Sequence, residues 1–276
     1  MTPPVPGTGP RRAAVLGSPI AHSLSPVLHR AAYAALGLTG WRYDALECDE
    51  TAFDELLAGL APDVVGLSCT MPLKRVALAA AADVAPAAAL VGAANTLVRT
   101  GPDRRGGDWA ADNTDVDGVL GALAEVGVTT APSSVVLLGA GGTAQAVVVA
   151  LARLGVARVR VGVRDPARAG ALTATAARAG VEVAVGPAPD GLDADLVVST
   201  LPGDAAAPLA DRIGRVGALL DVVYAPWPTT LGAAALAAGV PVAGGRAVLL
   251  HQAARQVELM TGRPAPFAAM RAALPG

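Results

Sequence analysis

The chain contains 276 residues, 53% of them hydrophobic, and carries a formal net charge of −2 at pH 7. This length is sufficient for two domains with separate cores, and the weakly acidic balance argues against a nucleic-acid-binding surface. No apolar run reaches membrane-spanning length, and Cys48 and Cys69 are too isolated for a disulfide framework or a metal motif, so we expect a cytoplasmic protein that contacts no membrane.

The first part of the chain has the pattern of an α/β domain. Residues 1–10 are rich in proline and glycine and lack the apolar core of a signal peptide, which predicts a loose tail. Strands and helices alternate after it. The predicted strands are 13–17, 42–46, 64–68 and 96–99, and the predicted helices are 26–36 and 53–60.

Two serines precede the first predicted helix. Ser25 stands before Pro26, which is a common arrangement of an N-cap followed by proline in the first turn, so Ser23 and Ser25 can be simple capping residues. Two hydroxyls beside a helix N-terminus can also bind a carboxylate. The local sequence leaves both interpretations open.

The polar composition is biased in a way that singles out a few residues. Lys74 is the only lysine among 21 basic residues, and Asn95 and Asn113 are the only asparagines. Lys74 follows Pro72 in a predicted first helical turn, where the helix dipole disfavours a cation. A solvated surface lysine is the ordinary alternative, but this unfavourable place and the rarity of lysine favour an acid/base role.

Asn95 and Asp115 have ordinary explanations as well. Asn95 can hold a turn through its side chain, and Asp115 can be a carboxylate that favours a helix N-terminus. Asp115 also follows the second asparagine, Asn113, at the predicted junction between two domains. Because ligand clefts form preferentially between domains, we expect the block 113–115 to contribute to a site.

A glycine-rich turn predicts a dinucleotide-binding domain. Gly139, Gly141 and Ala144 follow the apolar strand 135–138 and begin a predicted helix that ends near residue 154. This spacing permits a tight turn, lets a pyrophosphate approach the backbone and allows close packing between helix and strand. The helix N-terminus would then bind the phosphates.

The second strand of this domain, 158–163, is followed by Arg164 and Asp165, the position that distinguishes the two nicotinamide cofactors. An acidic residue binds the ribose hydroxyl of NAD, and arginine binds the 2′-phosphate of NADP, so the local sequence leaves the choice open; Arg164 can also be a plain surface residue. Further strands at 196–199 and 219–222 and helices at 230–238, 244–260 and 266–274 continue the pattern. These elements predict a two-domain α/β fold.

Seven blocks extend in order over nearly the whole chain: Gly17-Ser-Pro-Ile-Ala-His-Ser-Leu-Ser-Pro, Thr70-Met-Pro-Leu-Lys, Gly92-Ala-Ala-Asn-Thr, Asn113-Thr-Asp, Gly139-Ala-Gly-Gly-Thr-Ala, Asp221-Val-Val-Tyr-Ala-Pro and Leu249-Leu-His-Gln-Ala. Together these blocks resemble the signature motifs of the shikimate dehydrogenase family. The resemblance implies a substrate-binding domain at 11–112 and 246–276, a Rossmann-like NADP-binding domain at 113–245, and C-terminal helices that return to the first domain.

The resemblance also implies roles for individual residues. Lys74 and Asp115 would form the catalytic pair, and Ser23 and Ser25 would bind the substrate carboxylate. The remaining substrate contacts would come from Thr70, Asn95, Asp115, Tyr224 and Gln252. The cofactor would contact Gly139, Ala140, Gly141, Gly142, Thr143, Ala144, Arg164, Thr200 and Gly245. The implied activity is the reversible NADPH-dependent reduction of 3-dehydroshikimate to shikimate, in the route to aromatic amino acids, by a monomer or homodimer.

The chain departs from the family pattern at three places. Ser68-Cys69-Thr70 stands where the family usually has Asn-Val-Thr, which removes an amide near the expected substrate pocket, and Ala111 replaces a glycine. Val163-Arg164-Asp165 stands where the family usually has Asn-Arg-Thr. Arg164 favours NADP, whereas Asp165 would repel a 2′-phosphate and keeps NAD possible.

These departures leave three alternatives. Ser68 and Asp165 are compatible with a relative that oxidises quinate, or both quinate and shikimate, with NAD. A nucleotide-binding sensor of the same fold without catalysis would not need Lys74 and Asp115, and a purely structural α/β module would leave the single lysine unexplained. The three histidines are too scattered to suggest a metal site; they are His22, His29 and His251.

Overall fold

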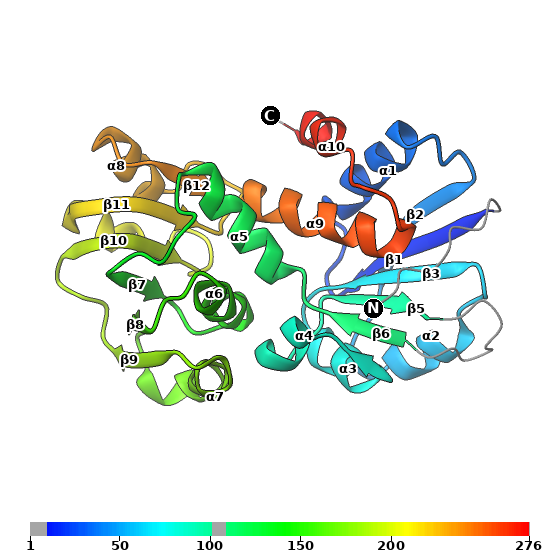
Figure 1. Ribbon diagram of the computed structural model, residues 1–276, viewed down its shortest axis with the longest axis horizontal. Coiled ribbons are helices and arrows are strands. Elements are labelled where there is room, and N and C mark those ends of the chain that lie inside the picture. Colours follow the sequence, from blue (N-terminus) through cyan, green and yellow to red (C-terminus); the bar gives the residue numbers. More distant parts are fainter. Residues whose placement is uncertain (1–9, 101–108, 276) are drawn as a thin grey trace. The chain divides into compact units, whose positions relative to one another are not determined.

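The computed structural model describes residues 10–100 and 109–275, so the predicted tail up to residue 9 and the glycine- and arginine-rich segment 101–107 lie outside the described residues. The chain divides into two compact units, which are drawn in Figure 1. The first unit ends at Thr114 and resumes at Gln252, and the second extends from Asp115 to His251. Each unit contains one six-stranded sheet.

The first unit has a mixed sheet with the strand order β2-β1-β3-β5-β6-β4. Its parallel part consists of β1 (Arg11–Gly17), β2 (Trp41–Glu47) and β3 (Val64–Cys69). The strand β5 (Thr96–Arg99) is antiparallel to β3 and to β6 (Trp109–Asp112), and the short β4 (Asp83–Val84) pairs with β6. The sequence pattern did not predict β4 or β6, because both are short and neither alternates polar and apolar residues.

Helices cover both faces of this sheet, as Figure 1 shows. They are α1 (Ser25–Ala35), α2 (Phe53–Gly59), α3 (Lys74–Ala79), α4 (Pro86–Val91), the C-terminal part of α9 (Gly245–Thr261) and α10 (Phe267–Ala273). Alternate residues of β1 explain the two layers. Ala13 and Val15 pack in a cluster with residues of α1 and α9, whereas Ala14 and Leu16 pack in a cluster with residues of α2, α3 and α4. The sheet is therefore buried on both faces.

The second unit has an entirely parallel sheet with the order β12-β11-β10-β7-β8-β9. Its strands are β7 (Val135–Leu138), β8 (Arg158–Gly162), β9 (Glu182–Gly186), β10 (Leu192–Ser199), β11 (Ile213–Asp221) and β12 (Val242–Gly244). Numbered from β7, this is the order 3-2-1-4-5-6 of dinucleotide-binding sheets. The predicted Rossmann-like fold is thus confirmed, although β9 and β12 were not predicted.

Helical elements precede, connect and follow these strands. They are α5 (Asp115–Glu125), α6 (Gly142–Arg153), α7 (Gly170–Ala179), α8 (Thr230–Ala237), the beginning of α9, and the 3₁₀ helices η1 (Pro166–Ala169) and η2 (Ala207–Arg212). Residues of α8 and η2 pack in one hydrophobic cluster with β7, β10 and β11, while α6 packs between α5 and α7. The chain passes between the units after Thr114 and within α9, so the C-terminal helices belong to the first unit, as the sequence predicts.

Candidate functional site

The two serines predicted to bind a carboxylate lie at the beginning of α1. The structure places the N-cap at Leu24 and gives it no capping side-chain bond, so Ser25 is the first helical residue rather than the cap. Ser23 Oγ accepts a hydrogen bond from the Ser25 amide at 3.3 Å, which orders the turn before the helix. The capping interpretation therefore applies in part to Ser23 and not to Ser25.

Thr70 and Lys74 follow the carboxyl end of β3. Thr70 is tied to the neighbouring strand because its amide donates to the Leu16 carbonyl at 2.9 Å, and Leu73 donates back to Thr70. Lys74 is half-buried and is the first residue of α3, as the sequence predicted. The Lys74 carbonyl accepts a hydrogen bond from Ala94 at 2.8 Å, so this turn is joined to the segment that carries Asn95.

Asn95 connects three segments that are distant in sequence. Its Oδ1 accepts the Thr114 amide at 2.8 Å, and its Nδ2 donates to Thr114 Oγ1 at 3.0 Å and to Gln252 Oε1 at 3.5 Å. Asn113, the other asparagine, donates from Nδ2 to the Ala93 carbonyl at 2.8 Å. The Asn95 side chain therefore does more than hold its own turn: it brings together the Asn113-Thr114 segment and α9.

Asp115 is placed by this same arrangement. It is the first residue of α5 and follows Thr114 directly, and the backbone and hydroxyl of Thr114 are both bonded to Asn95. Thr70, Lys74, Asn95 and Gln252 thus belong to the first unit, and Asp115 begins the second. The two asparagines that the composition singled out prove to be the residues that anchor the segment before Asp115.

The pKa values of the two cysteines in the first unit argue against a cysteine nucleophile there. Burial raises the pKa of the Cys69 thiol to about 12, although the nearby Lys74 opposes this shift. Burial also raises the pKa of Cys48. Because a thiol must ionise to act as a nucleophile, neither cysteine is suited to that role at neutral pH. Lys74 therefore remains the candidate for acid/base chemistry.

The glycine turn after β7 is tightly packed at Gly139 and open at Gly141 and Gly142. Gly139 has a φ of +102°, and a Cβ at this position would lie 2.5 Å from Thr200 Oγ1, so only glycine fits. Thr200 donates to the Leu138 carbonyl from its hydroxyl, which holds it beside the turn. Gly141 and Gly142 face open space, since an added Cβ at either one would meet nothing within 4 Å.

The other residues of the predicted cofactor site lie around this turn and in the later loops of the same unit. Ala144 is fully buried, whereas Ala140 and Thr143 are partly exposed. Gly245 begins α9, and a Cβ there would overlap the Val222 carbonyl, so glycine is required for the close approach of the two segments. The parallel sheet thus presents the glycine turn and Thr200 at the carboxyl ends of β7 and β10, where dinucleotides bind in this fold.

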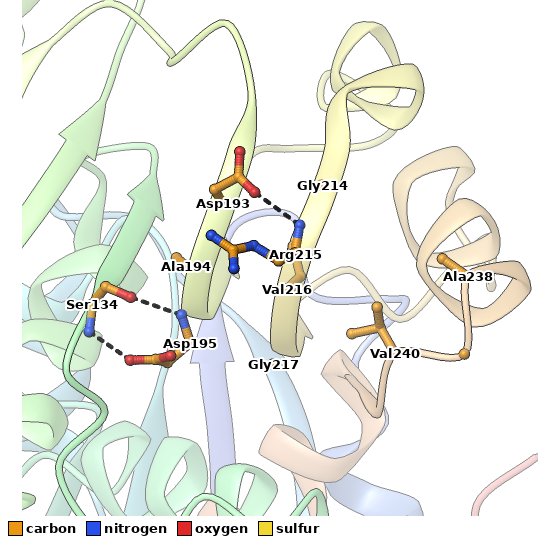
Figure 2. Close-up of a pocket in the computed structure, with 11 residues that line it drawn as sticks. Ser134, Asp193, Ala194, Asp195, Gly214, Arg215, Val216, Gly217, Ala238 and Val240 are labelled. Carbon is orange, nitrogen blue, oxygen red and sulfur yellow. Dashed lines mark hydrogen bonds between the residues drawn. The ribbon is translucent and has the colours of Figure 1, made fainter.

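A surface hollow in the second unit lies away from these residues. It encloses about 670 Å³ at the amino ends of β10 and β11, and Ser134, which precedes β7, lines it (Figure 2). Its acidic side chains are bonded to the backbone: Asp193 Oδ1 accepts the Arg215 amide and Asp195 Oδ2 accepts the Ser134 amide, both at 2.9 Å. The carboxylates of Asp193 and Asp195 are thus already bonded to backbone amides at the starts of the strands, so we assign the hollow no ligand.

Comparison with known proteins agrees with this arrangement. The family profile "Shikimate dehydrogenase substrate binding domain" matches residues 15–97, and "Shikimate 5'-dehydrogenase C-terminal domain" matches residues 245–274. The chain is 38% identical to a shikimate dehydrogenase (NADP(+)) of Symbiobacterium thermophilum over 96% of this chain and 94% of the relative. This chain belongs to the shikimate dehydrogenase family.

Solved structures of the family have the same fold. A shikimate 5-dehydrogenase from Mycobacterium fortuitum is 49% identical with a TM-score of 0.88, covering 98% of this chain and 99% of that one. The Thermus thermophilus shikimate 5-dehydrogenase in complex with NADP(H) and shikimate is 34% identical with a TM-score of 0.82, covering 96% of this chain and all of that one.

Within this family, the departure at Ser68 has a structural explanation. The sequence predicted that serine removes an amide near the expected substrate pocket, and the structure shows that the Ser68 hydroxyl itself bonds an amide side chain from α9. Ser68 Oγ donates to Gln256 Oε1 at 2.8 Å, and the Gln256 amide lies between β3 and β5. Gln256 was not recognised in the sequence, where it lies one turn after Gln252 on α9.

The departure at Asp165 has a local explanation. Asp165 Oδ1 accepts the Ala167 amide at 3.0 Å and caps η1, so the carboxylate is bonded to its own turn. Arg164 is exposed beside it, and a second exposed arginine, Arg168, lies in the last turn of η1. The sequence analysis did not single out Arg168, which lies four residues after Arg164.

Tyr224 belongs to a loop that Asp221 organises. Asp221 ends β11, and its two oxygens accept hydrogen bonds from the Val223 amide at 3.2 Å and from Thr229 Oγ1 at 2.7 Å. Burial raises the pKa of Asp221, and these two bonds oppose the shift. Asp221 therefore closes the loop from both ends, and Tyr224 on it is 38% exposed.

The described residues contain neither a cluster that could hold a metal ion nor a helix long and apolar enough to cross a membrane.

Proposed function

We propose that this chain catalyses the reversible NADPH-dependent reduction of 3-dehydroshikimate to shikimate. The observation that carries the proposal is the set of hydrogen bonds by which Asn95 joins Thr114 and Gln252, next to the turn that carries Lys74. Membership of the shikimate dehydrogenase family supports the same reaction. Of the residues assigned to the substrate, Asn95 and Gln252 bond each other directly.

Ser23 and Ser25 bind the substrate carboxylate in this proposal. Both lie at the N-terminus of α1, an eleven-residue helix whose first amides carry partial positive charge. Thr70, Asn95, Asp115 and Gln252 bind the ring hydroxyls, and Tyr224 adds a contact from the loop that Asp221 closes. Neutral amides and hydroxyls suit a polyhydroxylated ring, because each can both accept and donate.

Lys74 acts as the general acid. NADPH, when bound, supplies the hydride that reduces the C3 carbonyl, and the Lys74 ammonium donates a proton to the oxygen as negative charge develops there. Asp115 accepts a hydrogen bond from the C3 hydroxyl of shikimate and orients Lys74. In the oxidative direction Lys74 removes the hydroxyl proton. Such acid/base catalysis is typically worth about 10²–10⁴ in rate.

The cofactor interpretation depends on the turn after β7 and on η1. The open cradle at Gly141 and Gly142 fits a pyrophosphate, because backbone amides can approach it without a side chain between them. Arg164 binds the 2′-phosphate of NADP, with Arg168 as a second cation. Asp165 opposes this less than its charge suggests, since its carboxylate is bonded to the η1 backbone.

Initial rates measured by nicotinamide absorbance test the proposal, with shikimate and quinate each combined with NADP⁺ and NAD⁺. Turnover of shikimate with NADP⁺ is the expected result. Preference for quinate or NAD⁺ would instead assign the chain the alternative dehydrogenase activity. Cofactor binding without turnover of any pair would contradict catalysis and favour the sensor.

A further inference from the structure

A continuous series of hydrogen bonds runs through the first unit beneath the proposed substrate residues. Tyr43 donates to Ser68 Oγ at 2.6 Å, and Ser68 donates to Gln256 Oε1 at 2.8 Å. Gln256 Nε2 donates to Thr96 Oγ1 at 2.9 Å and to the Asn95 carbonyl at 3.2 Å. All five residues are at most 4% exposed, so water does not compete for these bonds.

Donor and acceptor chemistry allows one arrangement of this series. The Asn95 carbonyl can only accept, so Gln256 must direct its NH₂ group toward it and its oxygen toward Ser68. Ser68 must then donate to Gln256 and accept from Tyr43. Thr96 accepts from Gln256 and donates to Asn95 Oδ1 at 2.8 Å. The Thr114 amide, which can only donate, identifies the oxygen of the Asn95 side chain, and the series from Gln256 through Thr96 adds a second donor to the same oxygen.

Gln256 is connected to Gln252 in two ways: through the Asn95 side chain and through the helix that carries both glutamines. Asn95 Oδ1 is held by Thr96 and Thr114, which leaves its Nδ2 on the side of Gln252 Oε1, 3.5 Å away. Gln256 and Gln252 are also four residues apart on α9, so they share one face of this helix. The carboxamide of Gln256 therefore joins α9, which carries Gln252, to the start of β5, which Asn95 directly precedes.

We propose that Gln256 is a positioning residue for the substrate subsite formed by Asn95 and Gln252. This inference rests on the proposed function, because that function assigns the substrate to these two residues. Gln256 is buried, bonds the Asn95 carbonyl directly and supports the Asn95 carboxamide through Thr96. Ser68 and Tyr43 hold Gln256 from the other side.

The strand register shows where a replacement amide could come from. Ser68 and Thr96 are directly opposite each other in the antiparallel pair of β3 and β5. Side chains at such positions have Cβ atoms about 4.5–5.5 Å apart. An asparagine at position 68 can therefore place its amide against Thr96, provided that position 256 becomes small enough to receive it. A variant with asparagine at position 68 and a small residue at position 256 carries the amide on β3 instead of α9. It therefore distinguishes an effect of the missing amide from an effect of altered packing.

Steady-state kinetics of the intact enzyme test the proposal. Gln256→Met keeps the length of the side chain and removes its hydrogen bonds, and it should raise the KM for shikimate between about threefold and about tenfold, the effect of one net hydrogen bond. The KM for NADP⁺ should not change. Thr261→Val is the matched control: it removes a buried hydroxyl that bonds the Val257 carbonyl on the same helix, so it should lower Tm without changing the KM for shikimate.

The double variant S68N/Q256S gives the rescue. It should reverse most of the increase in the KM for shikimate that Gln256→Met causes. A double variant no better than Gln256→Met would assign the effect to packing and overturn the proposal. An unchanged KM for shikimate in Gln256→Met would overturn it as well.

Asparagine NMR supplies a readout that does not require turnover. The sequence has only two asparagines, so ¹⁵N labelling of asparagine side chains gives one amide signal pair for Asn95 and one for Asn113. In Gln256→Met the Asn95 pair should shift or broaden while the Asn113 pair stays in place. Unchanged Asn95 signals would overturn the proposal even if the wild-type chain does not oxidise shikimate, an outcome that would separately overturn the proposed function.

Discussion

The two units build their parts of the proposed site in different ways. In the second unit the glycine turn is contiguous, from Gly139 to Ala144, and one parallel strand presents it. In the first unit Asn95, Thr114 and Gln252 come from separate segments and meet through side-chain hydrogen bonds. A phosphate-binding turn needs a backbone shape that short spacing can encode. A site for a small polar ring needs side chains from several directions, which only a folded mixed sheet and a returning helix provide.

The largest expected effect concerns the single lysine of the first unit. Lys74→Ala should lower kcat by about 10²–10⁴, with a smaller change in the KM for shikimate, because the general acid is lost while most substrate contacts remain. Lys74→Arg should also lose turnover, since a guanidinium keeps the charge but does not release its proton at neutral pH. Steady-state rates with NADP⁺ measure both.

The neighbouring residue serves as the control for this prediction. Arg75 is exposed on the same helix, and Arg75→Ala should retain wild-type rates. Wild-type turnover in Lys74→Ala would remove Lys74 from the reaction.

A second prediction concerns how the stability of the first unit depends on pH. Burial lowers the pKa of His29 from 6.5 to about 4, and its ring stacks on Tyr43 at 3.9 Å. The unfolded state therefore binds more protons between these values, so stability is full above pH 6.5 and is lost as the pH falls through this window. The shift corresponds to about 3 kcal/mol.

Urea unfolding between pH 7 and pH 4 measures this loss, and His29→Phe should flatten the dependence because it keeps a stacked ring and removes the titrating group. Hydrogen exchange locates the effect, which should appear first in peptides of the first unit. Equal slopes for wild type and His29→Phe would show that other groups govern acid unfolding.

In the second unit, Arg164→Ala should weaken binding of NADP⁺ by about tenfold or more and leave NAD⁺ nearly unchanged. The reason is that a charge-assisted hydrogen bond to phosphate is worth about 1.5–3 kcal/mol. Ratios of kcat/KM for the two cofactors measure this preference.

Asp165→Ser is the matched variant. Serine retains an oxygen that can accept the Ala167 amide, so η1 stays capped while the negative charge is removed. It should favour NADP⁺ slightly. Equal weakening of both cofactors by Arg164→Ala would contradict the role of Arg164 in selection.

A further prediction concerns the N-terminus of α1. Replacement of both Ser23 and Ser25 by alanine should raise the KM for shikimate by about a hundredfold or more, since two hydrogen bonds to a carboxylate are lost, with kcat less affected. Kinetics and thermal unfolding are measured together. A lower Tm with an unaltered KM would mean that the serines only order the helix start.

The sequence predicted more of the second unit's site than of the first unit's. Spacing alone selected Gly139, Gly141 and Ala144, and the structure shows the physical reason in the positive φ and the close approach of Thr200 at Gly139. Composition selected Lys74, Asn95 and Asn113 without indicating their contacts. Gln256 carried no signal, because a polar residue one turn after another on a helix is ordinary until the strand opposite it is known.

Local sequence signals were sufficient to predict the α/β class, the glycine turn after β7 and the rare polar residues Lys74, Asn95 and Asn113. These features depend on local periodicity, backbone conformation and residue chemistry, all of which are encoded in short segments. Only the folded chain shows that the Ser68 hydroxyl meets the Gln256 side chain from α9 and that the Asn95 side chain meets Thr114 and Gln252. Each of these outcomes depends on which polar group a buried or turning segment meets, and for Gln256 that partner lies 188 residues away along the chain.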